Sequence, residues 1–157
     1  MKNDFNKSNK LTRILTVFMV GFILLVTIFH IIKLPVHMAD WLVPFKVVEP
    51  FYDVEDLDKQ YSKVMGYNKV KLVYENQEGI LTVWATSEIG WNKVSNWEEE
   101  VELLNGATGY YNETNLFQSI SFRVDEVEYS IDYKGNDPIS KSDLIKIANS
   151  IVITKFA

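Results

Sequence analysis

The stretch from Leu116 to Tyr133, which decides the fold, reads LFQSISFRVDEVEYSIDY. On both sides of Asp125-Glu126, apolar or bulky side chains alternate with polar ones, which is typical of strands with one buried face. Because only two residues join the two runs, the stretch predicts an antiparallel hairpin. The residues predicted on its buried face are Leu116, Gln118, Ile120, Phe122, Val124, Val127, Tyr129, Ile131 and Tyr133.

Two further hairpins are predicted upstream. In the first, alternating strands at Lys69–Glu75 and Ile80–Thr86 flank a glycine-containing turn, and Trp84 within the second strand is expected in the core. In the second, strands at Glu99–Leu104 and Ala107–Asn112 flank Asn105-Gly106, the dipeptide favoured in two-residue hairpin turns.

Two segments have the period of an amphipathic helix. Asp53 opens the first, with Gly66 as its stop, and Ser140 with Asp143 forms a capping-box pattern at the start of the second. The apolar stripes are Val54, Leu57, Tyr61 and Val64 in the first, and Leu144, Ile147, Ala148, Ile151 and Val152 in the second. The domain is therefore predicted as α+β: a meandering antiparallel sheet of about six strands, with one helix before it and one C-terminal helix.

The segment from Ile14 to Ile32 contains nineteen residues and no charge. As a helix it would be about 28 Å long, close to the thickness of the hydrocarbon core of a bilayer. We expect a single transmembrane anchor, with the lipid bilayer as its partner. Four basic residues precede the span, and the positive-inside rule places the N-terminus in the cytoplasm and the C-terminal domain outside.

A cleaved signal peptide and a buried soluble helix are the two alternatives to an uncleaved signal anchor. A signal peptide usually has a shorter apolar region and a small-residue cleavage site, but the nearest small residue here is Ala39, with His37 before it. A buried soluble helix would carry polar residues on one face. The predicted organisation is a cytoplasmic basic tail (1–13), the anchor (14–33), a juxtamembrane segment with a first strand (34–50) and an extracytoplasmic domain (51–157).

Three prolines make the juxtamembrane segment extended rather than helical, and Val47-Val48 is the expected first strand. Its apolar content leaves two arrangements: packing on the domain, or contact with the headgroups through Trp41.

Net charge and cysteine content limit the kinds of partner and site that the protein can have. Residues 34–157 carry eleven basic and twenty acidic side chains, a formal charge of −9, which disfavours nucleic acid. The chain has no cysteine, so disulfides, thiolate metal sites and thiol acylation are excluded.

Recognisable catalytic and metal motifs are absent from the sequence. Both histidines, His30 and His37, precede the folded domain, away from any serine of the sheet. The acidic run from Asp53 to Asp58 lacks the spacing of a calcium loop and suits a helix N-terminus better. We predict no catalytic residue, no cofactor and no metal, although a pair of carboxylates is always available among twenty acids.

Aromatic side chains are the candidate ligand or partner surface. Trp91 and Trp97 lie in an irregular stretch and are suited to stacking on a sugar or a peptide, with packing beneath the loop as the alternative. Tyr110 and Tyr111 complete the candidate set.

Several stretches resemble the bacterial family catalogued as domain of unknown function 4367. The C-terminal stretch Ile139–Ile151 is the most specific, and the resemblance extends over roughly Phe45 to Ile151. It implies a domain outside the membrane of a Gram-positive bacterium, behind an anchor or beside regulatory segments, and it implies no catalytic residue. The other matching stretches are Lys69–Asn76, Gly109-Tyr110-Tyr111, Ile120-Ser121-Phe122 and Tyr129-Ser130-Ile131.

The predicted function is therefore that of a membrane-anchored, non-catalytic binding module that senses or regulates the cell envelope through an unknown ligand or envelope protein. The first alternative is a lipid or lipoprotein carrier that uses an uncovered apolar sheet face. The second alternative is a small wall-active hydrolase.

Overall fold

A computed structural model describes residues 12–24, 27, 32–50, 58–88, 90 and 99–156 of the 157-residue chain. The chain divides into two compact units, Met1–Ile32 and Lys33–Ala157.

In the first unit, residues 12–24 are helical. The hydroxyls of Thr16 and Thr27 donate to the carbonyl oxygens of Thr12 and Ile23, at 2.9 and 2.8 Å, so both polar side chains are satisfied within the helix. Part of the predicted span Ile14–Ile32 lies outside the described residues, and the described helices include none that is both long and apolar enough to span a membrane.

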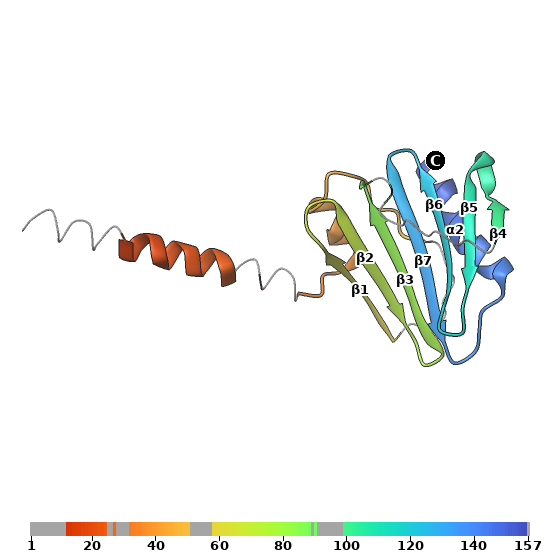
Figure 1. Cartoon of the computed structure of the whole chain (residues 1–157), viewed down its shortest axis with the longest axis horizontal. Coiled ribbons are helices and arrows are strands. Elements are labelled where there is room, and N and C mark those ends of the chain that lie inside the picture. Colours follow the sequence, from red (N-terminus) through yellow and green to blue (C-terminus); the bar gives the residue numbers. More distant parts are fainter. Residues whose placement is uncertain are drawn as a thin grey trace, which may run out of the picture. The chain divides into compact units, whose positions relative to one another are not determined.

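The second unit is built on a seven-stranded antiparallel sheet with the order β1-β2-β3-β7-β6-β5-β4, backed by helix α2 (Figure 1). This confirms the α+β class and the three predicted hairpins. The strands are β1 (Lys59–Val64), β2 (Lys69–Glu75), β3 (Gly79–Thr86), β4 (Glu99–Glu102), β5 (Thr108–Glu113), β6 (Gln118–Val124) and β7 (Val127–Gly135).

The sheet is not one continuous meander. Strands β1 to β3 form one meander and β4 to β7 another, and the two meet where β3 pairs with β7. The connection from β3 to β4 therefore leads from the middle of the sheet to its far edge, and the chain then returns strand by strand to β3.

The helix predicted from Asp53 is wrong over its second half, because Lys59–Val64 forms the edge strand β1. Residues 51–57 lie outside the described part of the chain. Strand β1 pairs along its whole length with β2, and Ser62 also exchanges two backbone hydrogen bonds with Leu34. These long-range pairings override the helical spacing of Tyr61 and Val64. Gly66, expected to end the helix, instead adopts its φ of 77° in the β1–β2 turn.

The predicted turns follow the expected chemistry. Asn105 and Gly106 both have the positive φ, 57° and 73°, that this dipeptide favours. The connection is longer than the predicted two residues, because β4 ends at Glu102, β5 begins at Thr108, and the 3-10 element η2 (Leu104–Gly106) lies between them. Asp125, in the turn between β6 and β7, also has a positive φ.

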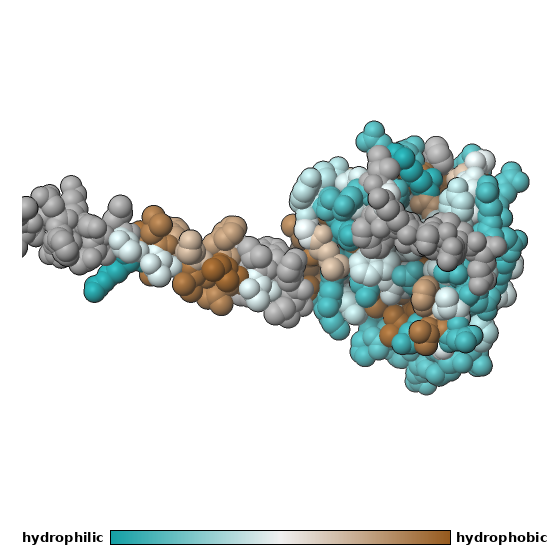
Figure 2. Space-filling view, in the orientation of Figure 1, coloured by the Kyte–Doolittle hydropathy of each residue, from teal (hydrophilic) through white to brown (hydrophobic). Residues whose placement is uncertain are grey.

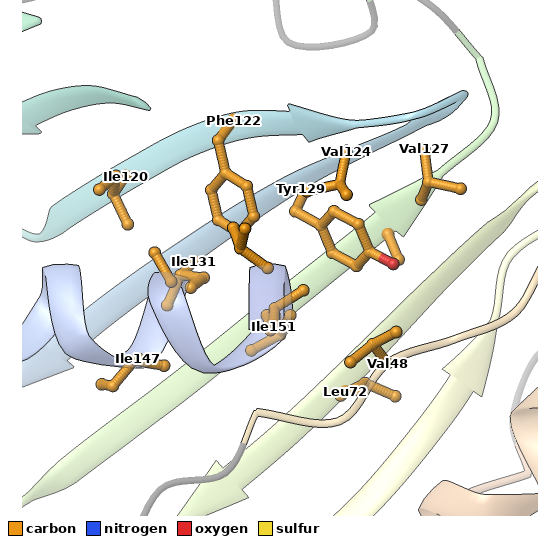
Figure 3. Close-up of a cluster of buried hydrophobic side chains, with 14 of the residues drawn as sticks. Val48, Leu72, Ile120, Phe122, Val124, Val127, Tyr129, Ile131, Ile147 and Ile151 are labelled. Atoms are coloured by element: carbon orange, nitrogen blue, oxygen red, sulfur yellow. The ribbon is translucent and has the colours of Figure 1, made fainter. Parts of the chain in front are cut away.

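Helix α2 (Lys141–Phe156) begins as predicted. The backbone N–H of Asp143 donates to Ser140 Oγ at 3.1 Å, and that hydroxyl donates to the Asp143 carboxylate at 2.6 Å. The five apolar residues predicted on its buried face are all buried against the sheet, where Phe122 and Tyr129 stack with ring centroids 5.5 Å apart (Figure 3).

Residues 34–50 cover the rest of the same sheet face. They contain the 3-10 helix η1 (Val36–Trp41), not an extended segment, and Val47-Val48 forms no strand. Val36, Ala39 and Val48 are nevertheless buried in the same core as Leu72 of β2. This inner face is therefore filled by α2 and residues 34–50, and the opposite, outer face remains uncovered by any described helix or strand (Figure 1).

Candidate functional site

The outer face of the sheet carries a central row of aligned side chains. The pairing register places Trp84 of β3 opposite Ser130 of β7, Ser130 opposite Ser121 of β6, and Ser121 opposite Tyr110 of β5. Because neighbouring strands lie about 4.8 Å apart, the two aromatic residues are separated by about 14 Å of small hydroxyl side chains. Ser121 and Ser130 are only 6% and 3% exposed, so the row is a buried polar strip between the two rings.

Hydrogen bonds connect part of this row to Asp132. Ser121 Oγ donates to Ser130 Oγ at 3.0 Å, and Ser130 Oγ donates to Asp132 Oδ1 at 3.1 Å. The indole Nε1 of Trp84 donates to the other carboxylate oxygen at 2.9 Å. Both oxygens of Asp132 are therefore occupied, and the carboxylate fixes the orientation of the Trp84 ring.

Burial dominates the electrostatics of Asp132. It raises the pKa of this carboxyl group, and the hydrogen bonds from Ser130 and Trp84, together with the positive charge of Lys71, lower it only in part. Lys71 lies over the Trp84 ring, with Nζ 5.1 Å from the ring centroid.

An open groove of about 410 Å³ lies on the outer face beside Tyr110. We call it the outer groove; it is lined by Gly90, Thr108, Tyr110, Ser121, Arg123 and Glu128 and by parts of Phe122 and Tyr129. Its volume is in the range of sites for small ligands. It combines an aromatic ring, two hydroxyls and one charge of each sign.

The two charged residues of the groove, Arg123 and Glu128, each form one hydrogen bond to a neighbouring backbone group. Arg123 and Glu128 are direct cross-strand partners. Arg123 Nε donates to the carbonyl oxygen of Asp125 at 2.8 Å, and Glu128 Oε1 accepts the backbone N–H of Gly90 at 2.6 Å. Each side chain is positioned by one hydrogen bond, and each has further hydrogen-bonding atoms beyond the one used.

The structure describes two of the four predicted surface residues, Tyr110 and Tyr111. Trp91 and Trp97 lie outside the described residues. Tyr110 lies in the outer groove and is 39% exposed, whereas Tyr111, its neighbour in an alternating strand, is 4% exposed on the inner face. The Tyr111 hydroxyl donates to Glu113 at 2.6 Å and accepts from Gln118 Nε2 at 3.1 Å, so Tyr111 is a core residue.

Sequence reasoning missed Trp84, Asp132 and Arg123. The expectation that Trp84 is a core residue is wrong, because Leu81, Val83 and Ala85 occupy the inner face and place Trp84 on the outer one. The alternation in β3 contained this signal. The register that joins β3 to β7, and so brings Trp84 to Asp132, had no local signature.

A second cavity of about 260 Å³ lies at one end of the sheet, lined in part by Glu113, Phe117, Gln118 and Tyr133. Gln118 is buried, and its Oε1 atom accepts no hydrogen bond from the described residues. Its Nε2 atom donates to Tyr111 and to the carbonyl oxygen of Ile139. This cavity is smaller than the outer groove.

The described residues contain no cluster of three or more His, Asp or Glu side chains suited to a metal ion. Within the described lining of the outer groove, Glu128 is the only carboxylate. Glycoside hydrolysis by the usual mechanism requires two.

The fold and groove define a single-sheet α+β domain with a ligand-sized groove on the sheet face opposite α2. No known protein family, curated protein or solved structure matches the chain. The resemblance to domain of unknown function 4367 accordingly stays a prediction.

Proposed function

We propose that this protein is a membrane-anchored binding module that presents its α+β domain outside the cell and holds a ligand in the outer groove. The observation that carries the proposal is the groove itself: an aromatic ring, hydroxyls and opposite charges gathered on the one sheet face that α2 and residues 34–50 leave open. A sugar ring or a short peptide segment has the flat apolar face and the hydrogen-bonding groups that match this lining.

The first unit supports the membrane location. At nine of the eleven positions from 14 to 24, its described helix carries exposed large apolar side chains, so they lie on every side of the helix, and Figure 2 shows apolar residues on the face in view. The described part of this unit contains no second element to bury them. A helix that is hydrophobic on all sides is stable in water only when covered, and lipid is the cover that the uncharged segment Ile14–Ile32 suits. The basic residues before this segment support a cytoplasmic N-terminus.

The carrier alternative has less support. It requires an apolar sheet face that is free to take a lipid chain, and the inner face is instead packed against α2 and residues 34–50 in one continuous core (Figure 3). The hydrolase alternative requires a second carboxylate, which the described lining of the groove does not supply.

Photo-crosslinking in living cells tests the binding function. The chain has no native cysteine, so a single cysteine at Thr108 on the groove, or at Lys134 on the same sheet face outside it, can carry the crosslinker. We expect a defined adduct from position 108 that disappears when Tyr110→Ala or Arg123→Ala is added, and no such adduct from position 134. Equal yields from both positions, or an adduct that neither substitution alters, would argue against a site in the groove.

A further inference from the structure

The corner of the sheet formed by β1 and β2 differs in charge from the rest of the second unit. Lys63 of β1 and Lys71 of β2 are direct cross-strand partners on the outer face. Like charges directly opposite each other destabilise a sheet. Among the described residues neither lysine forms an ion pair, although Asp132 lies close enough for Lys71 to affect its pKa.

Lys33 joins this pair through Tyr61. Its Nζ lies 4.2 Å from the centroid of the Tyr61 ring, and Nζ of Lys63 lies 6.0 Å from the same centroid. Three ammonium groups are thus held beside two aromatic rings on one side of a unit whose formal charge is negative. Cations held over rings in this way keep their charged ends open to an anion on the solvent side.

The turn between β1 and β2 adds exposed apolar side chains to the same corner. Met65 is 45% exposed and Tyr67 is 75% exposed, and the backbone N–H of Met65 donates to the carbonyl oxygen of Lys69 across the turn. Exposed aromatic and flexible apolar side chains next to lysines are typical of surfaces that rest in the headgroup region of a bilayer.

Chain connectivity decides what lies against this corner. Lys33 directly follows the last residue of the proposed anchor, so it must leave the bilayer at the headgroup level. Because Lys33 also contacts Tyr61 of β1, the proposed anchor keeps strand β1 near the membrane surface whenever this contact holds. The opposite sheet edge, β4, carries Glu99, Glu100 and Glu102, about six strand spacings or 29 Å away.

We propose that the β1–β2 corner, defined by Lys33, Lys63, Lys71, Met65 and Tyr67, docks on anionic phospholipid headgroups of the bilayer that holds the anchor. An anionic surface attracts this corner and repels the acidic β4 edge. Both effects favour the orientation in which β1 faces the lipid and β4 faces away from it. Docking orients the domain so that the acidic edge and the β5 side of the outer groove lie away from the lipid. This inference rests on the proposed membrane anchor but not on the ligand of the groove.

Lipid-quenching measurements on the full chain in nanodiscs test the docking. A single cysteine at Asn68 in the β1–β2 turn, or at Glu102 on β4, carries a fluorophore, and the lipids carry a quencher. Discs of phosphatidylcholine alone are compared with discs containing phosphatidylglycerol. We expect stronger quenching at position 68 in the anionic discs than in the neutral ones, an excess that salt weakens because the charges are exposed, and little quenching at position 102 in either.

Charge reversal supplies the matched control. Lys63→Glu combined with Lys71→Glu should lower the ratio of docked to undocked protein by about tenfold or more, whereas Lys134→Glu on the same face should leave it unchanged. Quenching at position 68 that is equal in neutral and anionic discs, or that survives the double reversal, overturns the docking while the anchor stands. Failure of the chain to enter discs at all overturns both the anchor and the docking.

Discussion

Trp84 and Asp132 are joined across strands β3 and β7 by a hydrogen bond of 2.9 Å, although they lie 48 residues apart in the chain. The carboxylate is partly buried on the outer face of the sheet, and it holds the indole ring at the end of the central row. The bond thus connects the two meanders of the sheet and fixes the position of the Trp84 ring on the outer face.

The raised pKa of Asp132 predicts a specific dependence of stability on pH. Because the pKa is higher in the folded than in the unfolded protein, the folded protein binds the proton first as the pH falls. Acidification from about pH 7 to about pH 4.5 should therefore stabilise the wild-type chain relative to Asp132→Asn, which has no proton to gain.

Urea unfolding of both chains in nanodiscs at several pH values checks this difference. Other titrating groups act alike in both chains and cancel in the comparison. A gap that stays constant, or that moves in favour of Asp132→Asn on acidification, would show that the carboxyl group is not desolvated as described.

Tyr110 and Tyr111 form a matched pair on opposite faces of β5. Tyr111→Ala should reduce the free energy of unfolding by about 3 kcal/mol or more, because it removes a buried ring and one of the two hydrogen bonds that Gln118 Nε2 donates. Tyr110→Ala should change it by less than about 0.5 kcal/mol and abolish crosslinking from position 108. Equal effects of the two substitutions on unfolding would contradict the assignment of faces.

Helix α2 offers a second matched pair. Ile147 is fully buried against the sheet and Ile153 is half exposed on the same helix. Ile147→Ala should cost about 2 to 5 kcal/mol in the free energy of unfolding, and Ile153→Ala less than about 0.5 kcal/mol. The midpoint of urea unfolding reports both, and a small loss for Ile147→Ala would show that α2 does not hold the inner face.

The parts of the fold that could be predicted are those with local signatures. Hairpins such as Leu116–Tyr133 show the alternation and turn residues of neighbouring strands, and α2 shows its cap and its apolar stripe. Strand β1 could not be recognised in this way. Its pairing with β2 and Leu34 outweighs a helical spacing that is only a weak preference.

The candidate site was less predictable than the fold. Tyr110 was identified as an exposed aromatic, but its neighbours in the groove come from three different strands, and their proximity depends on register. Strand β4, which follows β3 in the chain, lies at the far edge of the sheet, and β3 pairs with β7 instead. The hydrogen bond between Trp84 and Asp132 therefore could not be predicted from the local pattern of either strand.

Cysteine accessibility in intact cells tests most directly the proposal that an anchor at Ile14–Ile32 places the domain outside the cell. Single cysteines at Ser8 in the N-terminal tail and at Glu102 on β4 are exposed to a membrane-impermeant maleimide, with no native thiol to interfere. We expect labelling at position 102 in intact cells and at position 8 only after permeabilisation. Labelling of position 8 but not position 102 in intact cells, or recovery of the chain outside the membrane fraction, would contradict it.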